Sequence, residues 1–141
     1  MENHRDIYTV GMGNLDDNPI WTKGHGGRFI DLGSSVSFRQ AYILTSIMNC
    51  LVSPETGVFC FAQAYPQTPK ILLATHTDGT HICCGDENRI LASEADCAPC
   101  YRIISNCKTE PGDIHSLCAG RIPPEKVIAA IEEVYRSWQT K

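Results

Sequence analysis

The sequence lacks the features that mark several large classes of protein. It has no apolar run near the roughly 18–20 residues that a membrane-spanning helix needs. Its first six residues are polar, unlike the apolar segment of a secretory signal. Basic residues are not in excess, and a net charge of −4 argues against a surface for nucleic acid or anionic membranes. We therefore expect a cytoplasmic protein with no membrane span and no nucleic-acid partner.

The length of the chain and its cysteine content further restrict the class of protein to which it can belong. A chain of 141 residues can bury the core of one domain but is short for an enzyme with two lobes. It contains no internal repeat and no low-complexity segment. Eight cysteines without an export signal are better explained as thiols and metal ligands than as a disulfide framework.

Short apolar runs alternate with segments of helical periodicity, which predicts an α/β fold with a short parallel sheet. Ser37 and Gln40 have the spacing of a capping box and predict the start of a helix. Residues 75–96 have a less regular pattern, in which Asp78-Gly79 marks a turn, expected to join two short strands. We expect strands at residues 7–10, 29–32, 50–53 and 70–74, and helices at residues 38–48, 58–64 and 124–138.

The corner Ser53-Pro54-Glu55-Thr56-Gly57 lies between a buried strand and a helix, and it is the first candidate site. Open α/β sheets bind ligands at the carboxyl edge of their strands. The N–H groups at the start of a helix suit a phosphate. Glu55 would repel a phosphate, so its expected partners are sugar hydroxyls. The corner therefore predicts a nucleotide-sugar site, and the alternative is a set of side chains that only cap the helix.

Four cysteines near the C-terminus form the second candidate site. Cys97, Cys100, Cys107 and Cys118 have the spacing C-x2-C-x6-C-x10-C, and His115 is a replacement ligand. Four thiolates can surround a tetrahedral ion, which predicts structural zinc or iron. The alternatives are cysteines without a metal, whether reduced or in disulfides, and a redox pair at residues 97 and 100. Cys50 and Cys60 are expected to be small core residues.

Several of these segments, taken in series, resemble one known family. They are Ile30-Asp31-Leu32, Ser37-Phe38-Arg39, the corner from Leu51 to Gly57, Thr68-Pro69-Lys70, and the cysteine-bearing tail that leads into Ile122-Pro123-Pro124. The series is similar to the C-terminal donor-binding domain of glycosyltransferase family nine, the lipopolysaccharide heptosyltransferases and their relatives. The resemblance covers about residues 7 to 138 and is most specific at the corner.

The resemblance implies the Rossmann-like C-terminal half of a GT-B enzyme, which holds ADP-heptose or a similar ADP-sugar and needs no metal for transfer. It implies that Glu55 contacts the sugar and that the backbone of Thr56 and Gly57 contacts the diphosphate, with Ser53 in the same binding set. Cys60 stands where the family has a histidine. A loop at residues 75–79 replaces the family's Phe-Gly.

The family's acceptor domain, and the first strand and phosphate loop of its donor domain, have no counterpart in the sequence. We therefore expect a truncated donor-binding domain, with an α/β core at residues 1–96, a cysteine-rich segment at 97–120 and a helix at 121–141. Such a domain is expected to be inactive unless another chain supplies the acceptor domain. Its unpaired sheet edge favours a homo-oligomer. The alternative function is a non-catalytic interaction module or a metal-binding module derived from that fold.

Overall fold

The computed structural model describes residues 7–13, 27–33, 35–83, 85, 88–101 and 117–140. Contacts between Cα atoms divide the chain into two compact units, Met1–Leu44 and Thr45–Lys141. Neither of the expected divisions of the chain, near residues 97 and 121, is tested by the structure, and both remain predictions.

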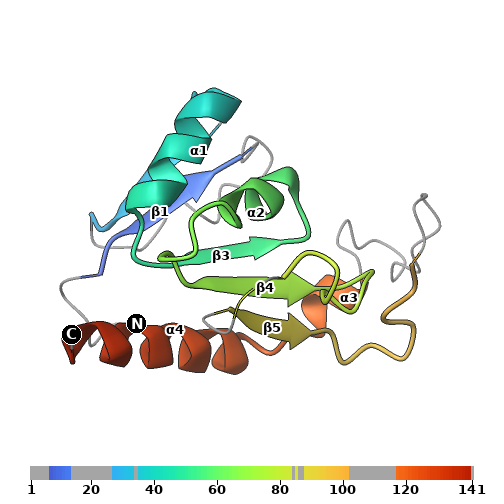
Figure 1. Ribbon diagram of the computed structural model, residues 1–141. Helices are drawn as coiled ribbons and strands as arrows, with labels where there is room; N and C mark the ends of the chain where they lie inside the picture. Colours follow the sequence, from blue (N-terminus) through green and yellow to red (C-terminus); the bar gives the residue numbers. More distant parts are fainter. Residues whose placement is uncertain are drawn as a thin grey trace. The chain divides into compact units, whose positions relative to one another are not determined.

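The first unit contains a two-stranded parallel sheet. Strand β1 (Thr9–Met12) pairs with β2 (Phe29–Gly33) from Thr9↔Phe29 onward, and the register shifts once between Gly11 and Met12. Thr9 and Val10 of β1 and Phe29 and Ile30 of β2 are β-branched or aromatic residues, which favour a pleated, half-buried surface. Strand β1 is labelled in Figure 1. Strand β1 begins two residues later than the sequence predicts.

Helix α1 (Phe38–Ile47) begins at the capping box expected from the sequence. The backbone N–H of Ser37 donates to Oε1 of Gln40 at 2.7 Å, and the N–H of Gln40 donates back to Oγ of Ser37 at 3.3 Å. Two backbone donors at the helix start, which have no carbonyl partner inside the helix, are thereby satisfied. This local prediction is confirmed.

The second unit is built on three parallel strands in the order β3-β4-β5. These are β3 (Leu51–Pro54), β4 (Lys70–Ala74) and β5 (Arg89–Ala92). Their arrowheads point to the same end of the sheet in Figure 1. Strand β4 is in the middle and is the most buried of the three, as its apolar run predicts. All three strands therefore deliver the residues that follow them to one edge.

Helices cover both faces of this sheet. Helix α2 (Gly57–Ala62) packs Phe59 and Ala62 against Leu51 and Leu72 in one apolar cluster. Alternate residues of a strand point to opposite faces. Arg89 is the register partner of Ile71, the residue before Leu72, so its side chain is on the face opposite α2. Helix α4 (Pro124–Gln139) therefore lies on that other face, where Nη2 of Arg89 is 2.7 Å from a carboxylate oxygen of Glu133. A short helix, α3 (Leu117–Gly120), precedes α4.

The expected α/β class with short parallel sheets is confirmed, while its assignment to a Rossmann-like half of a GT-B enzyme remains a prediction. The sequence did not predict β5 and α3. Within the part of residues 75–96 that the structure describes, the turn at Asp78-Gly79 does not join two strands, because β5 is the one strand there. Among the described residues, no helix is both long and apolar enough to cross a membrane.

Candidate functional site

The candidate site lies at the carboxyl edge of the three-stranded sheet. Glu55 follows β3, Thr75 follows β4, and Ser93 follows β5. Because parallel strands end at the same side of a sheet, these polar residues come together although up to 38 positions separate them along the chain. This is the edge at which open α/β sheets place their ligands.

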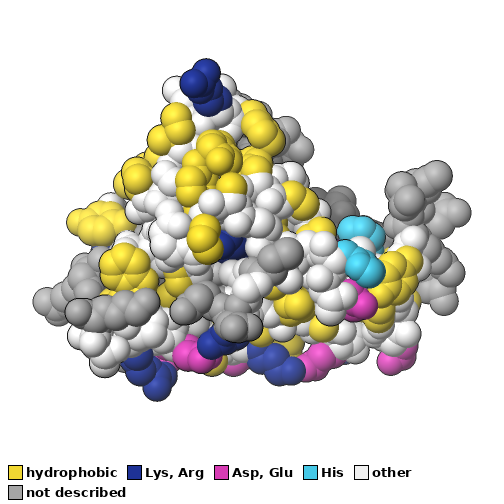
Figure 2. All heavy atoms as spheres, in the orientation of Figure 1, with side chains coloured by type: hydrophobic (Ala, Val, Ile, Leu, Met, Phe, Trp, Pro, Cys, Tyr) yellow, Lys and Arg dark blue, Asp and Glu magenta, His cyan; other side chains and the backbone are white. Residues whose placement is uncertain are grey.

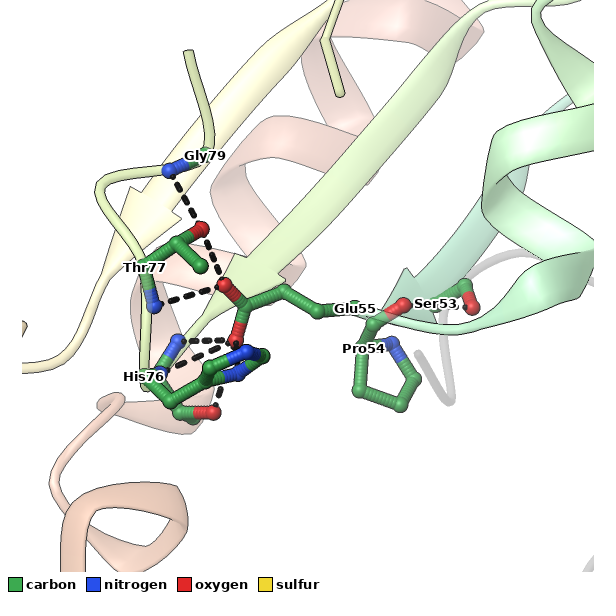
Figure 3. A network of polar contacts seen from close by, with 7 residues as sticks. Ser53, Pro54, Glu55, His76, Thr77 and Gly79 are labelled. Carbon is green, nitrogen blue, oxygen red and sulfur yellow. Dashed lines mark hydrogen bonds and ion pairs between the residues drawn. The ribbon is translucent and has the colours of Figure 1, made fainter. Parts of the chain in front are cut away.

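The carboxylate of Glu55 accepts six hydrogen bonds from the loop that follows β4. Oε2 accepts the backbone N–H and hydroxyl of Thr75, both at 2.9 Å, the backbone N–H of His76 at 3.0 Å and its Nδ1–H at 2.9 Å. Oε1 accepts the backbone N–H of Thr77 at 2.8 Å and the hydroxyl of the same residue. Figure 3 shows the carboxylate reaching across to this loop, between Thr77 and His76.

These bonds determine the charge state of Glu55. Its side chain is only 5% exposed. Burial raises the pKa of the carboxyl, but hydrogen bonds from the Thr77 hydroxyl and from the backbone N–H groups of residues 75–77 outweigh burial and lower the pKa from 4.5 to about 2. Glu55 is therefore a carboxylate at neutral pH. Since an ionised carboxyl offers about four lone-pair positions, no acceptor capacity is left for a further donor.

The loop after β4 is held against the sheet by a glycine. Gly79 has a φ of +77°, and its N–H donates to Oγ1 of Thr77 at 3.0 Å. A Cβ at this position would lie 2.7 Å from Cδ2 of Leu72 and 3.0 Å from Cγ2 of Ile90. Only glycine allows both this backbone conformation and this close approach. The loop that binds Glu55 is therefore fixed at its far end as well.

The structure places the other predicted corner residues next to Glu55. The hydroxyl of Ser53 donates to the carbonyl of Pro54 at 2.9 Å and lies 3.0 Å from the hydroxyl of Thr56. Thr56 is the N-cap of α2 in extended conformation, and its side chain does not cap the helix. Gly57 is the first helical residue, so its N–H has no carbonyl partner within α2. The alternative in which these side chains only cap the helix is thus not what the geometry shows.

The surface of the edge carries histidine, aspartate and tyrosine. The ring of His76 is 44% exposed, and its carbonyl accepts the backbone N–H of Tyr101 at 2.7 Å. Asp78 accepts the N–H and hydroxyl of Thr80 at 3.0 and 2.7 Å, and hydrogen bonds from Thr80, then Tyr101, lower its pKa. Figure 2 shows histidine side chains at the surface beside an acidic one. The edge therefore presents polar groups to solvent in front of the buried carboxylate.

The predicted metal ligands are only partly described. Cys97 is exposed, Cys100 is half-buried and Cys118 is buried in α3, and none of the three forms a disulfide. Cys107 and His115 lie outside the described residues. Within the described residues, no three His, Cys, Asp or Glu side chains are grouped as a metal site requires. The four-cysteine site remains a prediction. Cys60, expected in the core, is exposed on α2, because Phe59 and Ala62 take the inward positions of that helix.

The sequence predicted Glu55 but not its partners. Thr75, His76 and Thr77 were visible as a departure from the family pattern, with no indication that they bind the corner. The signal available was their position directly after the most buried strand, which neighbours β3 in the sheet. Comparisons with protein-family models, with curated proteins and with solved structures found no match for this chain.

Proposed function

We propose that the carboxyl edge of the β3-β4-β5 sheet binds the ADP-sugar donor of a heptosyltransferase-like glycosyltransferase. The observation that carries this proposal is the convergence of the 53–57 corner and the 75–77 loop at one edge of a parallel sheet. The resemblance supplies the ligand class. Glycosidic transfer then needs an acceptor domain beside this one, because two substrates must be held in reactive geometry.

Within this proposal Glu55 has a different part from the one expected. Its oxygens are occupied by the chain's own donors, so a sugar hydroxyl can reach the carboxylate only by displacing one of them. Glu55 instead holds the 75–77 loop in place beside the corner. The diphosphate is assigned to the backbone of Thr56 and Gly57 on the resemblance, since α2 has only six residues and a helix this short offers little by itself.

A second function is favoured by the same hydrogen bonds. A residue with a purely structural role is expected to have all its acceptor positions filled by donors of its own chain, as Glu55 has. In that case the fold has kept its shape while ligand binding is lost, and the protein is an interaction module. The two functions differ in one measurable property, the affinity for ADP-sugars.

Calorimetric titration with ADP-sugars, against GDP-mannose as a control, tests the proposal. The informative variant is Gly57→Pro, which removes one N–H while fitting the first helical turn. The extended conformation of Thr56, with φ −129° and ψ 166°, is the one a residue before proline adopts. Gly57→Ala keeps the N–H and is the matched control. We expect Gly57→Pro to weaken binding on the order of tenfold and Gly57→Ala to leave it unchanged. If titration of the native chain with every ADP-sugar gives no heat, the proposed donor binding is wrong and the interaction module is the remaining function.

A further inference from the structure

The His76 side chain contacts the buried carboxylate and also reaches solvent. Its Nδ1 lies 2.9 Å from Oε2 of Glu55, and its ring is 44% exposed while the Glu55 side chain is 5% exposed. The pair therefore spans from the interior of the edge to its surface. Figure 3 shows the ring lying against the carboxylate, on the side away from Thr77.

The contact with Glu55 fixes which ring nitrogen carries hydrogen. An ionised carboxylate only accepts hydrogen bonds, so Nδ1 of His76 must be the donor. The remaining nitrogen, Nε2, is then the atom through which the ring can bind something else. Nδ1 is thus engaged by Glu55 before any ligand arrives.

The backbone of His76 is held as firmly as its ring. Its N–H donates to Oε2 of Glu55 at 3.0 Å, and its carbonyl accepts the N–H of Tyr101 at 2.7 Å. Asp78, the nearest acidic residue along the chain, has its carboxylate bonded to Thr80 and Tyr101. The imidazole is therefore positioned in advance, and preorganised groups bind with a smaller loss of conformational entropy.

We propose that His76 binds a phosphate group of the ligand through Nε2, with Glu55 as the positioning residue. On binding, the ring holds a proton on each nitrogen, so that Nδ1–H donates to Glu55 and Nε2–H donates to a phosphate oxygen. The second proton comes from solvent. An imidazolium between a buried carboxylate and a phosphate forms two charge-assisted hydrogen bonds. The choice of a nucleoside diphosphate as ligand rests on the proposed function, while the phosphate contact of His76 rests on its geometry.

The first test observes His76 in the native chain with ¹H–¹⁵N spectra of the histidine rings. Inorganic pyrophosphate and ADP are the probes. We expect the free protein to show Nδ1 of His76 hydrogen-bonded to Glu55. Each probe is expected to shift the Nε2 signal of His76 and to leave that of His81 in place. His81 is exposed and only five residues away, so it reports non-specific attraction of the anion.

The second test measures affinity by calorimetry. His76→Phe keeps a flat ring and removes both nitrogens, and His81→Phe is the matched control. We expect His76→Phe to weaken ADP binding on the order of tenfold, because a hydrogen bond to a charged group is lost. His81→Phe is expected to leave ADP binding unchanged. Adenosine, which has no phosphate, should bind all three proteins alike.

The outcomes separate this inference from the proposed function. Pyrophosphate that shifts Nε2 of His76 without any binding of ADP-sugars supports the phosphate contact and removes the sugar-nucleotide function. Binding of ADP-sugars that is equal in the native and His76→Phe proteins, with His76 unshifted, overturns the inference and leaves the function. If neither pyrophosphate nor ADP shifts His76, the inference is wrong. Should His76→Phe fail to fold, the spectra of the native chain decide.

Discussion

At the scale of single residues, Glu55 connects two strand ends that are distant in the sequence. Its partners lie 20 to 22 positions further along the chain. Each of its two oxygens accepts both a backbone and a side-chain donor, so the carboxylate satisfies three consecutive N–H groups that would otherwise need water. A buried charge is tolerated here because it is fully hydrogen-bonded.

The lowered pKa of Glu55 predicts a pH-dependent stability. The pKa in the folded protein, about 2, is below the ordinary value of 4.5. The contribution of Glu55 is therefore fully present above pH 4.5 and is lost as the pH falls toward 2. A depression of this size corresponds to about 3 kcal/mol. We expect the free energy of unfolding of the native protein, measured by urea denaturation, to fall relative to that of Glu55→Gln across this range.

Glu94→Gln is the matched control for this prediction. Glu94 also lies at the carboxyl edge, after β5, but its side chain is 53% exposed and it forms a surface ion pair with Lys126. Surface ion pairs of this kind contribute about 0–1 kcal/mol. At pH 7 we expect Glu55→Gln to lower the free energy of unfolding by about 2–4 kcal/mol. The amide of the new side chain places an N–H donor where Glu55 accepts hydrogen bonds from other donors. Equal losses in the two variants would contradict the role of Glu55.

At the scale of elements, local sequence signals determined most of what could be predicted. The capping box at Ser37, the apolar run of β4 and the periodicity of α4 each depend on residues close to one another in the chain. Elements with such signals were expected nearly where they lie. Strand β5 has only four residues and follows a turn-rich segment, so no pattern distinguished it from a loop.

Only half of the candidate site could be predicted from the sequence. Glu55 could be placed at a sheet edge, because a buried strand and a proline corner precede it. The bonds to Thr75, His76 and Thr77 depend on which strand neighbours β3 and on how far the next loop folds back. The second of these is decided by Gly79 packing on Leu72 and Ile90, a tertiary contact with no local signal. Hence the sequence predicted a carboxylate open to a ligand, and the structure shows one with its acceptor positions filled.

The capping box gives a prediction for α1. Ser37→Ala removes the hydroxyl that accepts the N–H of Gln40, and it should lower the free energy of unfolding by about 1 kcal/mol. Ser137→Ala is the control, since the Ser137 hydroxyl only donates to the carbonyl of Val134 within α4. That variant is expected to change stability by less than about 0.5 kcal/mol. Urea denaturation of both variants measures the difference, and a loss of the same size in each would exclude a capping role.

At the scale of the whole molecule, the predicted metal site can be tested without reference to the sheet. If the four cysteines bind zinc or iron, elemental analysis of the purified protein should give one metal ion per chain. Cys100→Ser should lose the metal and lower the melting temperature by several degrees, because metal binding is coupled to folding. Cys60→Ser changes an exposed cysteine on α2 and should do neither. A native protein that contains no metal after zinc supplementation would contradict the prediction.

At the same scale, the edge strand β3 predicts that the protein associates with itself. Among the strands that the structure describes, β3 has a hydrogen-bonded neighbour on one side only, and its Val52 side chain is 37% exposed. Unpaired strand edges favour pairing with another chain, although Pro54 lacks an N–H and limits the number of bonds. We expect weak, concentration-dependent association in light scattering with size-exclusion chromatography. Val52→Lys should shift it toward monomer, while Ile128→Lys, at a similarly exposed position on α4, should not. A native chain that stays monomeric at micromolar concentration would show that this edge is already covered.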